Sequence, residues 1–376
     1  MNIAVASEIY PGETRIALTP ESGAKLRSLG AELSIQSGLG SSLGFTDEAY
    51  EKLGISIVTK REELLRNADL VLRVRPCPLE EIALLKPGAI HISYLDPFNQ
   101  GDLTAKLAAA GIRAISMEMI PRTTLAQKMD ALSSQASLAG YVAVILAAQR
   151  LHRIFPMMMT PAGTINPANV FILGAGVAGL QAIATAKRLG ARVSAFDIRP
   201  SSALEVESLG ARFLKIDIGE LEQTKDGYAK ELSAEQLAIQ KEGQAKACAA
   251  SDIVITTAQI FGRKAPVLIN KETIERMKKG SIIVDMAVES GGNVELSRMD
   301  EEVDVNGVTI IGYSNLAGHV ADHASQMYAN NLANLIEHFW DTESKALKLD
   351  LEDEILKGCL LTQDGEIVNE RLRSKR

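Results

Sequence analysis

The stretch 169-NVFILGAGVAGLQAIATAKRLGARVSAFDIR-199 decides the fold predicted for this chain. An apolar run typical of a buried strand ends in Gly174, Gly176 and Gly179, and a helical pattern follows it. Glycines in this spacing allow a tight turn, a close approach to a pyrophosphate, and close packing of helix on strand. Asp197 closes the next strand about 20 residues on, where a carboxylate accepts ribose hydroxyls. The pattern predicts a doubly wound dinucleotide-binding domain.

The acidic residue also selects the dinucleotide. A 2′-phosphate carries about −1.5 to −2 charges, and like unit charges about 4 Å apart cost about 4 kcal/mol at an effective dielectric constant of 20. Asp197 therefore favours NAD(H) over NADP(H). Arg199 could instead pair with a phosphate, or it could be a solvated surface arginine. The predicted contacts of the dinucleotide in this stretch are Gly174, Ala175, Gly176, Val177, Gly179, Asp197, Ile198 and Arg199.

Strand-like and helical runs alternate on both sides of this stretch, which is typical of parallel sheets covered by helices on both faces. Two such series predict two Rossmann-like domains. Residues 1–134 form the first, completed by 319–376, and residues 135–318 form the second, which binds NAD(H). A long helical segment precedes the second series and the segment 321–340 follows it. Two long helices that bridge two lobes would leave a cleft, where ligands favour binding.

Composition excludes several functions. The chain has 376 residues and a net charge of −7, so it lacks the basic surface expected of a nucleic-acid-binding protein. The N-terminus is not that of a secretory signal. The longest apolar run, 138-LAGYVAVILAA-148, is shorter than the roughly 20 residues of a membrane-spanning helix. The three cysteines are far apart and indicate neither a disulfide framework nor a metal site, which favours a reducing compartment.

Two segments interrupt the alternating pattern. Residues 219–247 are charged and almost free of large apolar side chains, which predicts a mobile surface loop followed by a solvated helix. Three consecutive methionines, Met157 to Met159, precede the second series. Methionine fills irregular gaps in apolar cores, so we expect these three to be core residues at the domain junction.

A polar stripe marks the stretch 121-PRTTLAQKMDALSSQASLAGY-141, which we interpret as a helix. At 100° per residue, Gln127, Asp130 and Ser134 lie within about 60° of one another, and Ser133 lies at the edge of that face. The stripe could be the solvent side of the helix. It could also face a ligand in the cleft, where amide, carboxylate and hydroxyl groups would hold the nicotinamide end of a dinucleotide.

Several blocks of the chain resemble the family of alanine dehydrogenase and the nicotinamide nucleotide transhydrogenase α subunit. The opening EIYPGETRIALTPESGAKL, with Arg15, is similar to the opening motif of the whole family. The blocks MEMIPRTTLAQKMDALSSQASLAGY and FPMMMTPAGTINPANVFILGAGVAGLQAIATAKRLGA are similar to the transhydrogenase branch, as are VESLGA, DGYAKE, ITTA and APVLI. The resemblance extends to LEDEILKGCLLTQDGEIV and implies two doubly wound domains with a cleft, the second binding NAD(H).

The resemblance also implies roles for particular residues. Arg122, Gln127, Asp130 and Ser133 match the loop and helix that hold the nicotinamide end. Gly227 and Tyr228 in DGYAKE resemble a mobile loop that closes over the nucleotide, with Gln240 behind it. Gln259 stands where relatives have leucine, so we expect a contact there through the backbone.

The choice between the two branches depends on missing groups. Alanine dehydrogenases carry a lysine and a histidine where this chain has Arg73 and Asp96. Arginine keeps its proton at any working pH, and aspartate is a poor substitute for a histidine tuned near neutrality. Hydride transfer between two nicotinamides moves no proton at the reacting carbons, so the transhydrogenase branch does not need those groups.

The resemblance therefore implies the NAD(H)-binding component of a proton-translocating transhydrogenase. NADH would give hydride to NADP⁺ on a separate subunit, and a membrane-spanning subunit would couple the reaction to proton passage. The chain would be a homodimer on the cytoplasmic face of the membrane, held there by these partners. An amino-acid dehydrogenase that grips a carboxylate with Arg15 and Arg73 is one alternative, and an NADH-sensing module without catalysis is another.

Overall fold

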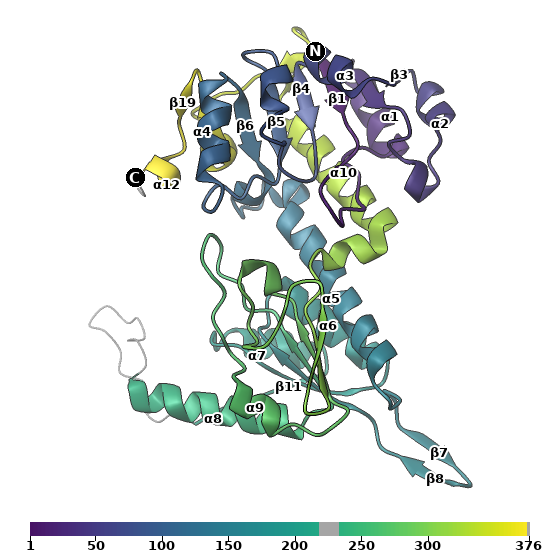
Figure 1. Ribbon diagram of the computed structural model, residues 1–376, viewed down its shortest axis with the longest axis vertical. Helices are drawn as coiled ribbons and strands as arrows, with labels where there is room; N and C mark the ends of the chain where they lie inside the picture. Colours follow the sequence, from purple (N-terminus) through teal and green to yellow (C-terminus); the bar gives the residue numbers. More distant parts are fainter. Residues whose placement is uncertain (218–232, 374–376) are drawn as a thin grey trace. The chain divides into compact units, whose positions relative to one another are not determined.

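The computed structural model describes residues 1–217 and 233–373 of the chain, which divides into two compact units. Unit 1 is Met1–Gln135 with Ala317–Arg376, and unit 2 is Ala136–Leu316. The first division falls inside helix α5 (Ala131–Arg150), so this helix belongs to both units (Figure 1). Helix α10 (Ala321–Phe339) belongs wholly to unit 1, so the expectation that it bridges two lobes was wrong.

The sheet of unit 1 has eight strands in the described residues, in the order β19-β18-β6-β5-β4-β1-β2-β3. Neighbours from β6 to β3 run parallel, as the alternating pattern predicts. The strands are β1 (Asn2–Val5), β2 (Glu32–Gln36), β3 (Ser56–Val58), β4 (Leu70–Leu72), β5 (Ile90–Ser93), β6 (Arg113–Ser116), β18 (Leu360–Gln363) and β19 (Glu366–Ile367).

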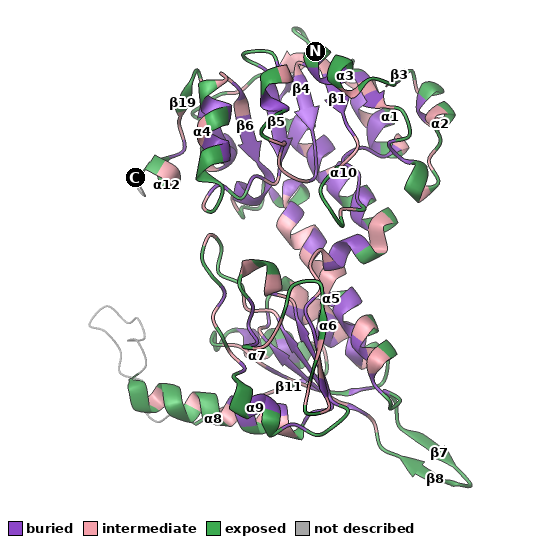
Figure 2. Cartoon of the chain, viewed as in Figure 1, coloured by how far each residue is buried: buried purple, intermediate pink, exposed green. Residues whose placement is uncertain are grey.

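Unit 2 contains a seven-stranded sheet within the described ranges, in the order β11-β10-β9-β12-β13-β15-β14. Its neighbours from β11 to β15 are parallel. The strands are β9 (Asn169–Leu173), β10 (Arg192–Phe196), β11 (Arg212–Phe213), β12 (Ile253–Thr256), β13 (Ile282–Asp285), β14 (Glu302–Val305) and β15 (Val308–Ile311). The central strands are buried, as their Val/Ile-rich sequences predict (Figure 2).

Each sheet has an antiparallel edge beside its parallel strands. Strand β18 runs antiparallel to β6 and β19, and β14 runs antiparallel to β15. Two-residue turns join both hairpins: Asp364–Gly365 joins β18 to β19, and Asn306–Gly307 joins β14 to β15. All four turn residues have positive φ, the conformation of the type I′ turn that matches strand twist. Asp-Gly and Asn-Gly are the strongest short-range hairpin signals, so these edges were readable in the sequence.

Local signals set where several helices begin. Thr19 caps α1 (Pro20–Ser28) with a capping box and a proline in the first turn, both of which are local signals in the segment TPES. Ser233 and Gln236 form the same box at α8 (Ala234–Ala250), whose first residues are largely exposed, as a solvated helix should be. The preceding loop predicted from residue 219 lies outside the described residues up to 232. The other helices are α2 (Asp47–Glu51), α3 (Arg61–Asn67), α4 (Gly101–Ala109), α6 (Val177–Arg188), α7 (Ser202–Ser208), α9 (Lys271–Glu275), α11 (Glu354–Cys359) and α12 (Glu370–Arg373).

Helix α5 departs from the expectation in length and in its start. It has 20 residues and a mean hydropathy of 1.5, so by length and composition alone it could cross a membrane, contrary to the argument from its short apolar run. Core helices of globular proteins meet the same criterion. Ser134 near its start bonds Asn331 of unit 1, and Arg150 at its end pairs with Glu302 of unit 2. Both ends therefore make specific contacts within the protein.

The methionine run is not part of the core. It leads into a hairpin of β7 (Met158–Thr160) and β8 (Gly163–Ile165), which extends away from the sheet of unit 2 (Figure 1). Met157 and Met159 are 60% and 73% exposed, so the core expectation was wrong. The hairpin thus presents a strip of exposed apolar residues, which the described ranges of the chain leave uncovered. By contrast, the three cysteines are free and buried.

Candidate functional site

The glycine turn of unit 2 lies between the end of β9 and the start of α6. Each of its three glycines has a different environment. Gly174 has a φ of +104°, and a Cβ there would lie 2.4 Å from Thr257 Oγ1. A Cβ on Gly179 would lie 1.9 Å from the carbonyl oxygen of Gly174, so this glycine lets α6 pack on the turn. Gly176 differs, because a Cβ there meets nothing within 4 Å. The middle glycine therefore leaves room on the outside of the turn for another molecule.

Asp197, directly after β10, holds this turn by hydrogen bonds. Its carboxylate accepts the backbone N–H of Ala175 at 2.7 Å, and the backbone N–H and Nε of Arg199 at 2.8 and 3.1 Å. Burial alone would raise the pKa of Asp197, but the bonds from Arg199 and Ala175 lower it below its ordinary value. Arg199 is thus paired with Asp197, although its side chain is largely exposed. Next to them Ile198 is 80% exposed, an apolar side chain open to a ligand.

Residues that sequence reasoning missed fix the loop after β12. Asp285 is fully buried and accepts the backbone N–H groups of Ala287, Asn293 and Val294. The Asn293 side chain accepts the N–H of Ala258 and donates to its carbonyl oxygen. No local pattern identifies such a pair, because the partners are 35 residues apart. Their bonds fix the backbone beside the glycine turn.

Gln259 follows Ala258 and is exposed, but its side chain already makes a hydrogen bond within the chain. Its Nε2 donates to the carbonyl oxygen of Met286 at 2.8 Å. A contact between a ligand and the backbone at this position stays a prediction. Gln240 lies in α8 and is partly buried. Gly227 and Tyr228 lie outside the described residues.

The polar stripe predicted on one helix face is arranged differently. Residues 121–126 are not helical, Gln127 begins the short 3₁₀ helix η4 (Gln127–Met129), and α5 starts only at Ala131. Asp130 therefore precedes the helix instead of lying on it. Its carboxylate accepts the backbone N–H and the hydroxyl of Ser133 at 2.9 and 2.6 Å. This is the bonding of a helix cap, which the helical spacing of the sequence concealed.

The four residues thus fall into two groups in unit 1. Gln127, Asp130 and Ser133 lie together at the junction of η4 and α5, and the side chain of Gln127 is exposed. Arg122 lies earlier, in the exposed loop that leads to this junction. The junction can offer an amide, a carboxylate and a hydroxyl to a ligand from one short segment.

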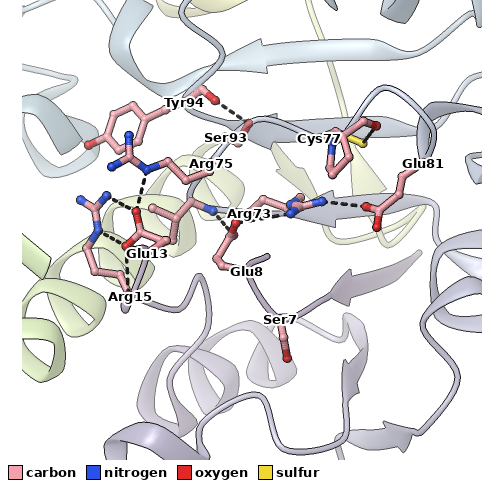
Figure 3. Close-up of polar contacts among 12 residues, drawn as sticks. Ser7, Glu8, Glu13, Arg15, Arg73, Arg75, Cys77, Glu81, Ser93 and Tyr94 are labelled. Atoms are coloured by element: carbon pink, nitrogen blue, oxygen red, sulfur yellow. Dashed lines mark hydrogen bonds and ion pairs between the residues drawn. The ribbon is translucent and has the colours of Figure 1, made fainter. Parts of the chain in front are cut away.

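A buried ionic cluster lies near the carboxyl ends of β1 and β4 in unit 1 (Figure 3). The Glu13 carboxylate accepts Nε and NH2 of Arg15, both at 2.7 Å, and Nε of Arg75 at 2.7 Å. Arg15 also donates from NH1 to Gln135 Oε1 at 2.8 Å. Burial alone would raise the pKa of Glu13, but the two arginines lower it to about 2. The carboxylate of Glu13 therefore already binds the guanidinium groups of both Arg15 and Arg75.

Arg73 belongs to a second group of bonds and not to the first. It is 1% exposed and pairs with Glu81 at 2.8 Å and with Glu8 at 3.4 Å. Asp96 has a positive φ of 44°, and its backbone N–H donates to the buried carboxylate of Glu118. The arginine that shares a carboxylate with Arg15 is thus Arg75. It lies two residues after Arg73, the arginine considered with Arg15 in the sequence. Among the described residues, no group of His, Cys, Asp and Glu side chains could hold a metal ion.

Two family descriptions together match nearly the whole chain. Residues 4–139 match the family described as alanine dehydrogenase/PNT, N-terminal domain. Residues 143–370 match alanine dehydrogenase/PNT, C-terminal domain. The chain therefore belongs to the alanine dehydrogenase/PNT family, and the expected family is confirmed.

Within this family the chain is more similar to transhydrogenases. It is 44% identical to an NAD(P) transhydrogenase subunit alpha chain of Rhodospirillum rubrum, over 99% of each chain. The solved structure of transhydrogenase from Sinorhizobium meliloti has a TM-score of 0.86 and 40% identity, covering 99% of this chain and 100% of that one. An L-alanine dehydrogenase structure has a TM-score of 0.83 but 26% identity, covering 100% and 98%. The shared fold and the higher identity together favour the transhydrogenase branch, as the sequence predicts.

Proposed function

We propose that this chain is the NAD(H)-binding component of a proton-translocating NAD(P) transhydrogenase. NADH on this chain gives hydride to NADP⁺ on a partner subunit, and a membrane-spanning subunit couples the transfer to proton translocation. The observation that carries the proposal is the similarity to transhydrogenase alpha subunits over nearly the whole chain. The open space outside Gly176 supports it, since a pyrophosphate needs such an approach to the backbone.

The nucleotide would bind along the carboxyl edge of the unit 2 sheet. The pyrophosphate would meet the backbone at Gly176 and Val177, and α6 would direct its N-terminal amides towards it. The carboxylate of Asp197 would accept the ribose hydroxyls, and the exposed side chain of Ile198 would contact the adenine. Gln259 would contribute its backbone. The resemblance implies that Gly227 and Tyr228 close over the bound nucleotide, with Gln240 behind them.

The nicotinamide end would be held by residues from unit 1. Arg122, Gln127, Asp130 and Ser133 offer charge, amide, carboxylate and hydroxyl groups, the types that bind a carboxamide and a ribose. Bound NADH supplies the hydride, and the protein supplies alignment. No general acid or base is required of these side chains, because the reacting carbons exchange no proton.

The ionic cluster argues against the amino-acid dehydrogenase alternative. That reaction needs a cationic grip on the substrate carboxylate, and Arg15 and Arg73 were the residues available for it. Arg15 is bound by Glu13 and Gln135, and Arg73 is bound by Glu8 and Glu81. A substrate carboxylate would have to displace buried carboxylates at both positions. The NADH-sensing alternative differs only in lacking hydride transfer, so the experiment below decides it.

The exposed hairpin supports the homodimer. Met157, Met158, Met159 and Ile165 give it an apolar surface that the described residues of this chain leave open. Flexible, polarizable methionines suit a surface that packs against another protein, and a second copy of this chain would bury it. Attachment at the cytoplasmic face of the membrane would then occur through the partner subunits.

The test is to mix the purified chain with an NADP(H)-binding transhydrogenase component and to follow hydride exchange between NADH and an NADP analogue. We expect exchange only when both proteins are present. Binding of NADH without exchange would favour the sensing module. Turnover of NAD⁺ with alanine by the chain alone would favour the dehydrogenase.

A further inference from the structure

Two asparagines on α10 hold one carbonyl group beside the proposed nicotinamide contacts. Nδ2 of Asn331 donates to the carbonyl oxygen of Lys128 at 2.8 Å, and Nδ2 of Asn334 donates to the same oxygen at 3.0 Å. A carbonyl oxygen has two lone pairs, so both are used here. Lys128 is the middle residue of η4, directly after Gln127 and two residues before Asp130. Residues more than 200 positions away in sequence thus fix this turn.

Further hydrogen bonds set the orientation of both amides. The hydroxyl of Ser134 donates to Oδ1 of Asn331 at 2.7 Å, and Nζ of Lys25 donates to Oδ1 of Asn334 at 2.7 Å. Because each amide oxygen already has a donor, each Nδ2 must face the Lys128 carbonyl. Asn331 also links η4 to the first turn of α5, where Ser134 lies. The arrangement is a built clamp and not a chance contact.

The turn needs such a clamp because it is weak by itself. A 3₁₀ helix of three residues has poor hydrogen-bond geometry. Within this one, the N–H of Met129 bonds Ala126 at 2.9 Å, and the N–H of Asp130 bonds Gln127 at a longer 3.3 Å. The buried side chains of Ala126 and Met129 anchor the turn to the core. The bonds from Asn331 and Asn334 to Lys128 hold the turn on its other side, between Gln127 and Asp130.

We infer that Asn331, supported by Asn334, is a positioning residue for hydride transfer. Its amide is taken up by Ser134 and Lys128, and it acts by fixing the direction in which η4 presents Gln127 and Asp130. The inference rests on the proposed function, since it concerns the geometry of that same reaction. Neither asparagine stands out in the sequence, because α10 lies in a distant part of the chain.

The test uses near-isosteric variants of the full chain, reconstituted with the NADP(H)-binding component. Asn331→Asp keeps an acceptor for Ser134 but loses the donor to Lys128, and Asn331→Leu loses both without adding charge. We expect single-turnover hydride transfer at saturating NADH to slow by about 10- to 100-fold, as for a misplacement of about 1 Å. NADH affinity should stay close to that of the wild type, and stability should fall by about 1 to 3 kcal/mol, the cost of losing buried hydrogen bonds, which leaves the chain folded under assay conditions. Amide hydrogen exchange in residues 121–130 should be faster in both variants.

The matched control is Gln326→Ala. This exposed amide lies on the same helix and bonds Glu21 of α1 instead of the turn. Transfer rates in both Asn331 variants equal to this control would overturn the inference. A fall in hydride-transfer rate that is proportional to the fraction of unfolded protein would also overturn it. If one variant fails to fold, Asn334→Asp supplies the same comparison. Failure of the wild type to transfer hydride would refute the proposed function instead, while hydrogen exchange would still report on the clamp.

Discussion

The carboxylate of Asp130 receives two hydrogen bonds from Ser133, one from its backbone N–H and one from its hydroxyl. The first satisfies an amide that has no partner within the helix, so Asp130 caps α5. The same carboxylate is a proposed contact of the nicotinamide end. Most substitutions of Asp130 would therefore remove both the helix cap and the proposed nicotinamide contact. A replacement that keeps the cap tests the contact alone.

Asparagine and alanine separate these roles at position 130. Asparagine caps helices as well as aspartate does, so Asp130→Asn should unfold at the wild-type midpoint and still bind NADH. Its hydride transfer should slow, because the carboxylate charge is lost. Asp130→Ala should slow transfer too and should also lose about 1 kcal/mol of stability. Transfer rates and urea unfolding measure the two effects. Wild-type transfer in Asp130→Asn would remove this carboxylate from the site.

The glycine turn provides a similar separation. A Cβ at Gly176 meets no atom, and φ there is −79°, which any residue adopts. Gly176→Ala should therefore fold as the wild type does, and even gain about 0.4 to 1 kcal/mol from the unfolded state. NADH affinity should fall about tenfold or more, on the order of 1.4 kcal/mol, because the methyl group fills the space of the pyrophosphate. Nucleotide titration and thermal unfolding without nucleotide give the two values.

Gly179→Ala is the counterpart of that variant. Its Cβ would lie 1.9 Å from the Gly174 carbonyl oxygen, so α6 must shift. We expect a loss of about 1 to 3 kcal/mol in the absence of any nucleotide. If Gly176→Ala bound NADH normally, the pyrophosphate would not lie at the middle glycine.

The buried carboxylate of Glu13 should make a large contribution to the stability of unit 1. Glu13→Gln leaves Arg15 and Arg75 without their shared counter-ion, and breaking a buried pair in this way costs about 3 to 5 kcal/mol. The pKa of Glu13 is lowered to about 2 from 4.5, so this contribution is complete above pH 4.5 and is lost as the pH falls towards 2. Urea unfolding at several pH values should show the gap between the two proteins narrowing over that range. A constant gap would mean that the charge of Glu13 does not matter.

Much of the fold could be predicted because its signals are local. The glycine turn, the cap at Thr19 and the Val/Ile-rich strands each depend on residues within one short segment. The two hairpins at Asn306–Gly307 and Asp364–Gly365 were also local signals, but the dominant alternating pattern concealed them. The start of α5 was missed for a different reason, since helical spacing continues through Asp130 although that side chain is used as a cap.

The rest of the candidate site depends on contacts between distant residues. Gln135 bonds Arg15 across 120 positions, and Asn293 holds Ala258 across 35. Nothing in a single sequence states which buried polar groups will be partners. Arg73 and Arg75 both follow β4, and the sequence does not say which of them shares a carboxylate with Arg15. The path of the loop that carries Glu13 decides it: Glu13 pairs with Arg75, and Arg73 pairs with Glu81.

His91 should make unit 1 sensitive to mild acid. It is fully buried, and neither ring nitrogen has a hydrogen-bond partner in the described structure. Burial, together with the charge of Arg73, lowers its pKa to about 3. The unfolded chain takes up this proton near pH 6.5, but the folded protein does not until about pH 3. Stability is therefore intact above pH 6.5 and falls by about 1.4 kcal/mol per pH unit below it.

His91→Leu removes the titrating group and two unsatisfied nitrogens at a similar volume. At pH 7.5 the variant should be at least as stable as the wild type, and at pH 5.0 it should be more stable by about 2 kcal/mol, because about 1.5 pH units of the slope are gone. Urea unfolding of unit 1 at these two pH values measures the difference. The exposed His323, replaced by Gln, is the control for removing a histidine elsewhere in unit 1. Equal slopes for wild type and His91→Leu would mean that the buried imidazole takes up its proton in the folded protein.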